Sequence, residues 1–467
     1  MDKMKRLLEI LVIITAIALV GCNNNYGDYK IKDGIILYNT PTRPAGQQDM
    51  LGFAAEPIPT VRVGFIGLGM RGPGAVRRWC AIEGTEIVAL CDLKPEGIAK
   101  GQKHIADAGR EPAAEYCGKE SWRQLCERED IDLVYIITDW KNHAQMALYA
   151  MECGKHVAIE VPAAMNMEEI WALVNTSERT RKHCIQLENC VYDRFEITAL
   201  NMAQQGLFGE ILHVEGAYVH CLAEYWDRYH ENWRLDFNRE NAGDVYPTHG
   251  IGPICQVLNI HRGDRMKNLV AMSTKAVSGP KYWQKLFGEP CSNFANGDQT
   301  TTLISTENGK VIQLHHNVMT PRPYSRDYAL VGTTGYATKY PIQGFLLGEE
   351  TIGEVDIENL NSHRMVDNET FKRLMEQYKH PVTEHTEAMA AKVGGHGGMD
   401  YVMDYRLVYC LQNGLPLDMD VYDLAEWCCP IELSATSIKH GSMPVAVPDF
   451  TRGGWNKIDG YRHAWKE

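Results

Sequence analysis

A short apolar run that leads directly into a glycine-rich turn constrains the fold of this chain more than any other feature. Residues 61–66 read Val-Arg-Val-Gly-Phe-Ile, which is typical of a buried parallel strand. Residues 67–72 then read Gly-Leu-Gly-Met-Arg-Gly. Gly67 allows a tight turn, Gly69 lets the backbone approach a pyrophosphate, and Gly72 lets helix and strand pack closely. This segment predicts the first strand and the phosphate-binding turn of a dinucleotide-binding domain.

The sequence after this turn alternates between strands and helices, which gives the glycine motif its weight. Residues 86–90 predict a second strand that ends at Asp92, whose carboxylate can accept both hydroxyls of a ribose and would repel a 2′-phosphate. Asp92 therefore favours NAD over NADP, and capping of the next helix is the alternative role. Further elements follow as strands at 132–138, 156–160 and 183–187, with helices around 143–153 and 168–181. This is the pattern of a doubly wound, Rossmann-type parallel sheet.

Two loops at the expected strand ends complete the predicted cofactor site. One reads Thr-Asp-Trp-Lys-Asn-His over 138–143, and the other reads Glu-Val-Pro over 160–162. Ligands bind at the carboxyl edge of such sheets, where both loops would lie. Trp140 could flank the nicotinamide, and simple packing at the surface is the alternative.

The second half of the chain changes to longer strands. Residues 209–220 predict one strand, 300–320 a hairpin that turns at 307–310, and 328–340 a hairpin that turns near Thr334. An open, mostly antiparallel sheet with flanking helices accounts for them, so we expect an α+β domain. One face of this sheet could pack on the cofactor domain, and the other could meet a partner subunit in a homo-oligomer.

Polar and aromatic side chains gather at five places in this second half. They are Tyr218 with His220, Trp233 with Arg234, Asp-Val-Tyr-Pro-Thr-His at 244–249, Pro-Arg-Pro-Tyr at 321–324, and Gly-Gly-His-Gly-Gly-Met-Asp at 394–400. A single histidine or tyrosine is more often a structural residue. Their grouping beside proline and glycine, outside regular periodicity, favours a binding pocket.

The first 22 residues have the features of an export signal. A basic stretch at 3–6 precedes an apolar run at 7–20, which is too short for a comfortable membrane span. The run ends in Leu-Val-Gly-Cys, similar to a bacterial lipobox in which Cys22 carries the lipid. An ordinary signal peptide or a start-transfer helix is the alternative. We expect an exported lipoprotein of the cell envelope, and the outer membrane is favoured because Asn23 is not an aspartate-type retention signal.

Length and composition set the remaining limits. A chain of 467 residues is too long for one compact core. We divide it into a signal peptide (1–22), a tether and lead-in (23–60), the NAD-binding domain (61–190), the α+β domain (191–430) and a C-terminal tail (431–467) that packs on the domains. A net charge of -13 disfavours nucleic acid. The 14 cysteines contain no CxxC pair, and no metal site is predicted.

The order of these motifs resembles the glucose-fructose oxidoreductase / inositol dehydrogenase superfamily. Its members commonly carry Glu-Lys-Pro at the fifth strand, with the lysine near the reacting carbon. Here Val161 replaces that lysine, which disfavours a plain dehydrogenase. The motifs at 67–72, 140–143, 160–162, 246–253, 321–324 and 394–400 resemble instead one branch, the family 109 glycoside hydrolases, which are NAD-dependent α-N-acetylgalactosaminidases.

The resemblance implies which residues form the two halves of the site. Tightly held NAD would be bound, besides the glycines of the turn, by Met70, Arg71, Asp92, Trp140, Asn142, His143, Glu160, Val161 and Asn189. The sugar of a glycan would contact Tyr218, Arg234, Tyr246, Pro247, Thr248, His249 and Tyr324.

The resemblance also implies a mechanism without the two carboxylates of an ordinary glycosidase, for which the motifs offer no pair. The sugar loses a hydride from C3 to NAD, then a proton from C2, and then the oxygen at C1. Water adds and the hydride returns, so no net redox change remains. His249 would deprotonate or orient the C3 hydroxyl, because an imidazole titrates near neutral pH. Tyr324 would be an acid or base at C2 or C1, helped by a cation such as Arg322.

Other functions stay open at this point. An exported sugar or polyol oxidoreductase of the same superfamily would share the fold and the NAD site but perform net hydride transfer. A hydrolase of the same mechanism could act on another glycoside. A non-catalytic, glycan-binding lipoprotein is the alternative from a different class.

Overall fold

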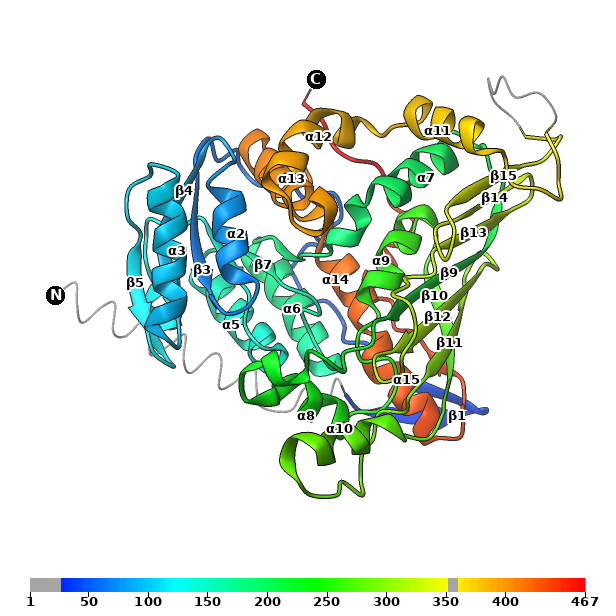
Figure 1. Ribbon diagram of the computed structural model, residues 1–467, viewed down its shortest axis with the longest axis horizontal. Coiled ribbons are helices and arrows are strands. Elements are labelled where there is room, and N and C mark those ends of the chain that lie inside the picture. The colour runs from blue at the N-terminus through cyan, green and yellow to red at the C-terminus, as the bar shows by residue number, and fades with distance from the viewer. Residues whose placement is uncertain (1–26, 352–359, 467) are drawn as a thin grey trace.

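The computed structural model describes residues 27–351 and 360–466. It contains two sheets that lie on either side of a central group of helices (Figure 1). The expected signal peptide (1–22) and its Cys22 lie outside the described residues. The fold confirms the two predicted parts, a parallel sheet at the start and a large, mostly antiparallel sheet after it.

The first sheet is parallel throughout, in the order β5-β4-β3-β6-β7-β8. Its strands are β3 (Val61–Ile66), β4 (Thr85–Asp92), β5 (Ala114–Cys117), β6 (Leu133–Ile136), β7 (His156–Ile159) and β8 (Cys184–Gln186). Helices α2 (Gly72–Trp79) and α3 (Pro95–Asp107) pack together, and α4 (Ser121–Cys126), α5 (Trp140–Glu152) and α6 (Met167–Thr180) form a second group. The doubly wound sheet is confirmed. The edge strand β5 was not predicted, because its residues Ala-Glu-Tyr-Cys alternate between half-buried and exposed and form no apolar run.

The second sheet has ten strands in the order β1-β2-β16-β10-β11-β12-β9-β13-β14-β15. From the centre of the sheet to its edge at β15, its strands are, in chain order, β9 (Ile211–Val219), β10 (Met266–Ser273), β11 (Thr300–Thr306), β12 (Val311–Asn317), β13 (Ala329–Gly332), β14 (Gly335–Thr338) and β15 (Gly344–Leu347). All neighbours are antiparallel except the pairs β9–β12 and β2–β16. Both predicted hairpins are confirmed as β11–β12 and β13–β14, whereas β10 and β15 were not predicted.

The lead-in and the C-terminal segment belong to this sheet, which corrects the expected tether. Strands β1 (Tyr29–Lys32) and β2 (Ile35–Tyr38) form a hairpin at its edge, and β16 (Val445–Ala446) joins them to β10. Ile36 in β2 is fully buried and β1 pairs with β2, so residues 29–38 form the edge of the sheet rather than a tether. The predicted boundary between residues 430 and 431 also falls inside a helix, since α15 extends from Pro430 to Lys439. This helix packs on β10 and so belongs to the second domain.

The remaining helices lie between and around the sheets. They are α7 (Arg194–Gln204), α8 (Trp233–Glu240), α9 (Thr248–Val257), α10 (Ser278–Phe287), α11 (Asn368–Gln377), α12 (Pro381–Val393), α13 (Met399–Asn413) and α14 (Val421–Cys428), with 3-10 turns η1 (Asn189–Tyr192), η2 (Trp226–Arg228), η3 (His230–Asn232) and η4 (His396–Gly398).

A buried polar contact fixes α13 against the first domain. Asp404 in α13 accepts hydrogen bonds from Arg78 Nε of α2 at 2.7 Å and from the Tyr135 hydroxyl of β6 at 2.8 Å. All three side chains are buried. A buried carboxylate needs such partners, so this contact holds the start of α13 close to the glycine turn.

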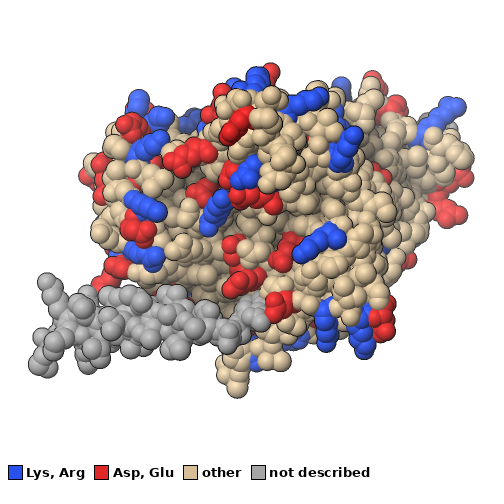
Figure 2. Space-filling view, turned by 90° about the horizontal axis from the view of Figure 1, so that it is seen from below, with Lys and Arg blue, Asp and Glu red and all other residues tan. Residues whose placement is uncertain are grey.

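On the face seen from below, the surface has no extended patch of side chains of one charge. Lys and Arg are interspersed with Asp and Glu there, between broad uncharged areas (Figure 2). That face therefore has no extended basic footprint of the kind that binds nucleic acid. Within 27–351 and 360–466, no helix combines the length and the apolar character needed to cross a membrane.

Candidate active site

The glycine turn has the geometry that a dinucleotide requires. Gly67 has a φ of +94°, and a Cβ there would lie 2.4 Å from the carbonyl oxygen of Ile137. A Cβ at Gly72 would lie 2.2 Å from the carbonyl oxygen of Gly67, so this glycine lets α2 start against the turn. A Cβ at Gly69 would meet nothing within 4 Å. The open side at Gly69 is where a pyrophosphate could approach the backbone.

Asp92 lies at the end of β4 and turns its carboxylate toward the glycine turn. Its Oδ2 accepts a hydrogen bond from the backbone N–H of Leu68 at 2.5 Å, and its Oδ1 accepts one from that of Lys94 at 2.8 Å. Helix α3 begins after Lys94 without a side-chain cap, so the alternative in which Asp92 caps this helix is wrong. The carboxylate keeps lone pairs for ribose hydroxyls.

The loop before α5 is held by its own polar side chains. Asp139 caps α5 and accepts a hydrogen bond from the Asn142 amide at 2.7 Å. The His143 ring is buried, with Nδ1 2.8 Å from the carbonyl oxygen of Pro162 and Nε2 3.1 Å from that of Thr138. Burial lowers the pKa of His143. Asn142 and His143 therefore hold the two predicted loops in place.

Arg71 connects the glycine turn with the rest of the site. Its Nε donates a hydrogen bond to Glu160 Oε1 at 2.9 Å, and its Nη2 lies 3.9 Å from Asp400 Oδ2. The second oxygen of Glu160 accepts the backbone N–H of Val161 at 3.3 Å. Met70, beside Arg71, is 58% exposed and faces away from the core.

A close contact between α9 and β9 places His249. A Cβ at Gly216 in β9 would lie 2.4 Å from the carbonyl oxygen of Gly250, and a Cβ at Gly250 would lie 2.4 Å from the backbone nitrogen of Ala217. Only facing glycines allow this distance, so the start of α9 lies directly on the strand that carries Tyr218. The ring centroids of His249 and Tyr218 are 5.5 Å apart.

Four predicted residues from the two domains form one cluster. The ring centroids of Tyr218 and Tyr246 are 4.3 Å apart, and those of Trp140 and Tyr246 are 5.6 Å apart. The guanidinium carbon of Arg234 lies 5.0 Å from the Trp140 ring, and Arg234 Nη2 donates a hydrogen bond to the Tyr218 hydroxyl at 3.4 Å. Trp140 is buried in this cluster, so simple surface packing is wrong for it. The predicted cofactor loop and the predicted sugar residues are direct neighbours.

His249 lies between a carboxylate and a phenol. Its Nδ1 is 2.7 Å from Glu188 Oε1, and its Nε2 is 3.3 Å from the Tyr246 hydroxyl. Glu188 is fully buried, and His249 is partly exposed. Pro247 and Thr248 form the buried start of α9. They set the helix direction and do not themselves face an open space.

Tyr324 lies beside this cluster, but its cationic neighbour is not Arg322. The ring centroids of Tyr324 and His220 are 5.2 Å apart. Arg326 Nη1 donates a hydrogen bond to the Tyr324 hydroxyl at 3.2 Å, and Arg326 is anchored by buried Glu196, whereas Arg322 is exposed. Burial raises the pKa of Tyr324 and Arg326 only lessens the rise, so the phenol is protonated at neutral pH.

The glycine-rich loop at 394–398 brings another histidine to the site. All five residues have positive φ, between +43° and +103°, which glycine adopts readily. His396 Nδ1 lies 2.9 Å from Asp400 Oδ2, and the Asn189 amide donates to Asp400 Oδ1. Burial raises the pKa of Asp400, but His396 and the arginines Arg71 and Arg78 hold it below the usual range. Asn189 therefore contacts the network that holds Arg71.

His220 shows that the polar clusters converge. Its Nδ1 lies 3.0 Å from the Tyr218 hydroxyl. Burial, with Arg234, His249 and His396 nearby, lowers the pKa of His220 to about 4. The His220 ring is therefore neutral at pH 7. Arg234, His249 and His396 lie close enough to it to affect its pKa.

Sequence reasoning missed three residues that complete this site. Glu188 lies two residues after the end of β8, and the rule that ligands bind at the carboxyl edge could have identified it. Arg326 and Glu196 pair across 130 residues of chain, and no local pattern marks such a pair.

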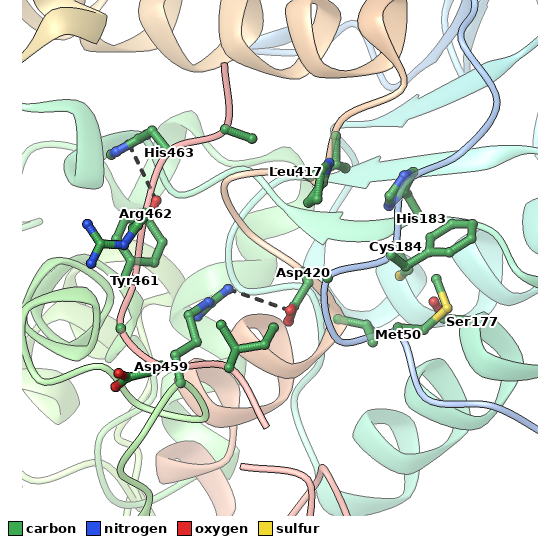
Figure 3. A pocket seen from close by; sticks show the side chains of 18 residues that line it. Met50, Ser177, His183, Cys184, Leu417, Asp420, Asp459, Tyr461, Arg462 and His463 are labelled. Atoms are coloured by element: carbon green, nitrogen blue, oxygen red, sulfur yellow. Dashed lines mark hydrogen bonds and ion pairs between the residues drawn. The ribbon is translucent and has the colours of Figure 1, made fainter. Parts of the chain in front are cut away.

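A separate cavity of about 290 Å³ lies elsewhere, between residues 50–53, the start of β8, the loop before α14 and residues 458–464 (Figure 3). None of the predicted site residues lines it. His183 and Cys184 in its wall mark the amino end of β8, whereas Glu188 follows the carboxyl end. The cavity therefore opens at the edge of the sheet opposite to the candidate site.

Two groups of described residues have ligand atoms close enough for a metal ion, namely Glu188, Cys190 and His249, and His261, Asp420 and Asp423. In the first group the carboxylate and the imidazole are hydrogen-bonded to each other directly. In the second group the Arg262 guanidinium binds Asp423 through two hydrogen bonds and already supplies the positive charge. The donor sets therefore give no reason to place a metal.

Comparisons with known proteins agree with this geometry. Residues 192–457 match the family model described as "Glycosyl hydrolase 109, C-terminal domain". Residues 61–187 match the model described as "Oxidoreductase family, NAD-binding Rossmann fold". Among solved structures, an NAD binding oxidoreductase from Klebsiella pneumoniae is similar with a TM-score of 0.63 at 16% identity, over 84% of this chain and 99% of that chain. The WlbA dehydrogenase from Bordetella pertussis, in complex with NADH and UDP-GlcNAcA, has a TM-score of 0.59 at 14% identity, over 85% of this chain and 100% of that chain. At these identities the likeness shows the fold alone.

Relatives of known family are much more similar in sequence. "Glycosyl hydrolase family 109 protein 1" from Bacteroides thetaiotaomicron is 62% identical over 99% of this chain and 100% of its own length. "Glycosyl hydrolase family 109 protein" from Porphyromonas gingivalis is 63% identical over 92% of this chain and 93% of its own length. The match to the family model and these identities agree with the site geometry, and the chain belongs to glycoside hydrolase family 109.

Proposed function

We propose that this protein removes terminal α-linked N-acetylgalactosamine from glycans, with NAD held tightly through each turnover and no net oxidation. The observation that carries the proposal is the direct contact between the cofactor loop at Trp140 and the cluster around Tyr246 and His249. A reaction that begins by oxidising a sugar carbon needs a dinucleotide site directly beside a proton acceptor. The choice of N-acetylgalactosamine rests on the resemblance of the runs at 246–253 and 394–400.

The carboxylates of the site support this route over that of an ordinary glycosidase. The ordinary route needs one free acid and one free base or nucleophile across the scissile bond. Glu160 is paired with Arg71, Asp400 is paired with two arginines, and Glu188 lies buried behind His249. Among the described residues of the site, these three carboxylates are engaged and leave no free pair.

The first domain fits NAD. The turn at Gly69 leaves room at the backbone for the pyrophosphate, and Asp92 would accept the ribose hydroxyls. Arg71 and Trp140 would border the nicotinamide side of the site, since both adjoin the Tyr246 cluster. When bound, NAD would supply a reversible hydride acceptor for C3 of the sugar, and a ketone at C3 would make the C2 proton acidic.

The second domain supplies the proton transfers and the sugar contacts. His249 Nε2 faces the site and takes the proton of the C3 hydroxyl. Arg234 donates hydrogen bonds to sugar oxygens or to the acetamide, from a position fixed by the Tyr218 hydroxyl. Tyr324 keeps its proton at neutral pH, so we assign it as the donor to the departing oxygen at C1.

Release of an aryl group from an aryl α-N-acetylgalactosaminide tests this function. We expect the purified chain from Asn23 onward to complete many turnovers without added cofactor, and without accumulating reduced nicotinamide. Product and nicotinamide absorbance are followed together. One reduced nicotinamide formed per sugar would identify the net-redox oxidoreductase instead. Protein that binds glycan but carries no NAD and releases nothing would support the non-catalytic alternative.

We also propose a homo-oligomer formed through the outward face of the ten-stranded sheet, and export as a lipoprotein through residues 1–22. Strand pairing places Met272, Leu303 and Val311 on one face, and they are 65%, 47% and 38% exposed. Exposed apolar side chains on a sheet favour burial against a second copy. Light scattering of the soluble part tests the assembly, and a monomer mass at micromolar concentration would contradict it.

A further inference from the structure

A buried carboxylate lies directly behind the imidazole that faces the site. Glu188 is 0% exposed, and its Oε1 is 2.7 Å from His249 Nδ1. The same oxygen accepts the backbone N–H of Cys190 at 3.0 Å, so the carboxylate is fixed from its own loop. No residue role so far accounts for a fully buried acid at this position, and isolated burial of a charge is costly.

A glycine in α9 leaves the space that the Glu188 side chain occupies. A Cβ at Gly252 in α9 would lie 3.0 Å from Glu188 Cγ, so glycine at this position lets the acid pass under the helix. His249 lies one helical turn earlier on the same helix. Because Glu188 follows β8 and His249 belongs to α9, the acid and the imidazole come from two segments that are far apart in the chain.

The contact decides which ring nitrogen carries the proton. Burial raises the pKa of Glu188, but His249, the Cys190 N–H and the Thr248 hydroxyl bring it below the usual range, so Glu188 is ionised and can only accept. The hydrogen on the ring therefore lies on Nδ1. In the neutral ring Nε2 is then an unprotonated acceptor, and it points toward Tyr246 and the site.

We propose that Glu188 is the positioning residue of His249: it holds the imidazole with Nδ1–H toward itself and stabilises the positive charge that the ring gains when Nε2 accepts the sugar proton. This deepens the proposed function and rests on it. In the step concerned, the O–H bond of the C3 hydroxyl breaks and the Nε2–H bond forms. Glu188 stays ionised throughout and exchanges no proton.

The test is Glu188→Gln, with Glu188→Asp as the conservative variant and Glu426→Gln as the matched control. Glu426 is also buried, and its Oε2 is 2.6 Å from His261 Nδ1, which follows the opposite end of α9 from His249. We expect Glu188→Gln to lower kcat about a hundredfold and to leave the NAD content unchanged. Glu188→Asp, which keeps the negative charge, should lower kcat much less. Glu426→Gln should leave kcat within about threefold.

The pH profile separates positioning from a merely structural role. The titratable and charged groups around the ring are Glu188, Cys190, Tyr218, His220, Tyr246 and Arg234. Of these only Glu188 is changed, and the protonated ring loses its negative neighbour. The acidic limb of kcat/KM should therefore move to lower pH in Glu188→Gln and stay in place in Glu426→Gln. An unmoved limb with unchanged kcat would overturn the proposal.

A spectroscopic measurement keeps the inference independent of the hydrolytic activity. Nitrogen NMR of labelled histidine, with His249→Asn to assign the signal, reports the tautomer of His249 directly. We expect Nδ1–H in the natural chain and a changed tautomer distribution in Glu188→Gln. If the natural chain hydrolyses no glycoside but shows this tautomer, the proposed function fails and the positioning stands. Nε2–H in the natural chain would overturn the positioning whatever the activity.

Discussion

His249→Ala is expected to lower kcat about a thousandfold while leaving NAD bound, because it removes the imidazole that joins the buried Glu188 to the open side of the site. His220, another imidazole of the cluster, hydrogen-bonds Tyr218, and burial beside Arg234 keeps its ring neutral. His220 therefore cannot replace His249 as the acceptor of the C3 hydroxyl proton, because its ring lies at a different place in the site. The glycine turn and Asp92 are untouched, so the cofactor site should persist.

The measurement pairs kcat on an aryl glycoside with NAD released by denaturing the purified variant. His230→Ala is the control, since His230 is exposed on η3 and outside the cluster. We expect the control to keep full activity. A His249→Ala protein that retains more than about a tenth of kcat, with a normal NAD content, would contradict the assignment of this imidazole as the proton acceptor.

Gly72→Ala is expected to abolish NAD binding and to destabilise the protein even without cofactor. The added methyl would lie 2.2 Å from the carbonyl oxygen of Gly67, and the backbone must move to avoid it. Overpacking of this kind costs about 1–3 kcal/mol of unfolding free energy. Gly69→Ala is the matched variant, because its Cβ meets nothing within 4 Å.

The two variants therefore separate two effects of the same chemical change. Gly69→Ala should unfold like the natural chain when NAD is absent but bind NAD at least about tenfold more weakly, since its methyl projects where the pyrophosphate approaches. Thermal unfolding of the NAD-free proteins and titration with NAD are the measurements. Equal NAD affinity in Gly69→Ala and the natural chain would show that the cofactor does not approach this turn.

The sequence predicted the parts of the fold that local patterns determine. The turn from Gly67 to Gly72, the strand before it and the two hairpins are marked by apolar runs and turn residues, and all are confirmed. Strand β1 is mostly exposed and joins the sheet only through β2, which pairs with β16 some 400 residues later in the chain. Such a pairing leaves no local signal, so residues 29–38 looked like a tether.

The candidate site shows the same division. Trp140, Arg234 and Tyr246 were named from their motifs, and the structure brings them together. Arg326 in place of Arg322 as the neighbour of Tyr324 could not be predicted, because the direction of each side chain depends on the isolated pairing of Val219 with Ser325 and on buried Glu196. Partners that are chosen by packing across the sheet lie beyond what spacing can indicate.

Hydrolysis by the proposed route passes through loss of the C2 proton, and hydrogen exchange at that carbon is the most direct measurement of this step. An aryl α-N-acetylgalactosaminide is turned over by the purified chain in heavy water, and the released sugar is examined at C2 by NMR. We predict deuterium at C2 of the product and none at C2 of the unreacted glycoside. Complete release of sugar that carries only hydrogen at C2 would contradict the oxidation and elimination route.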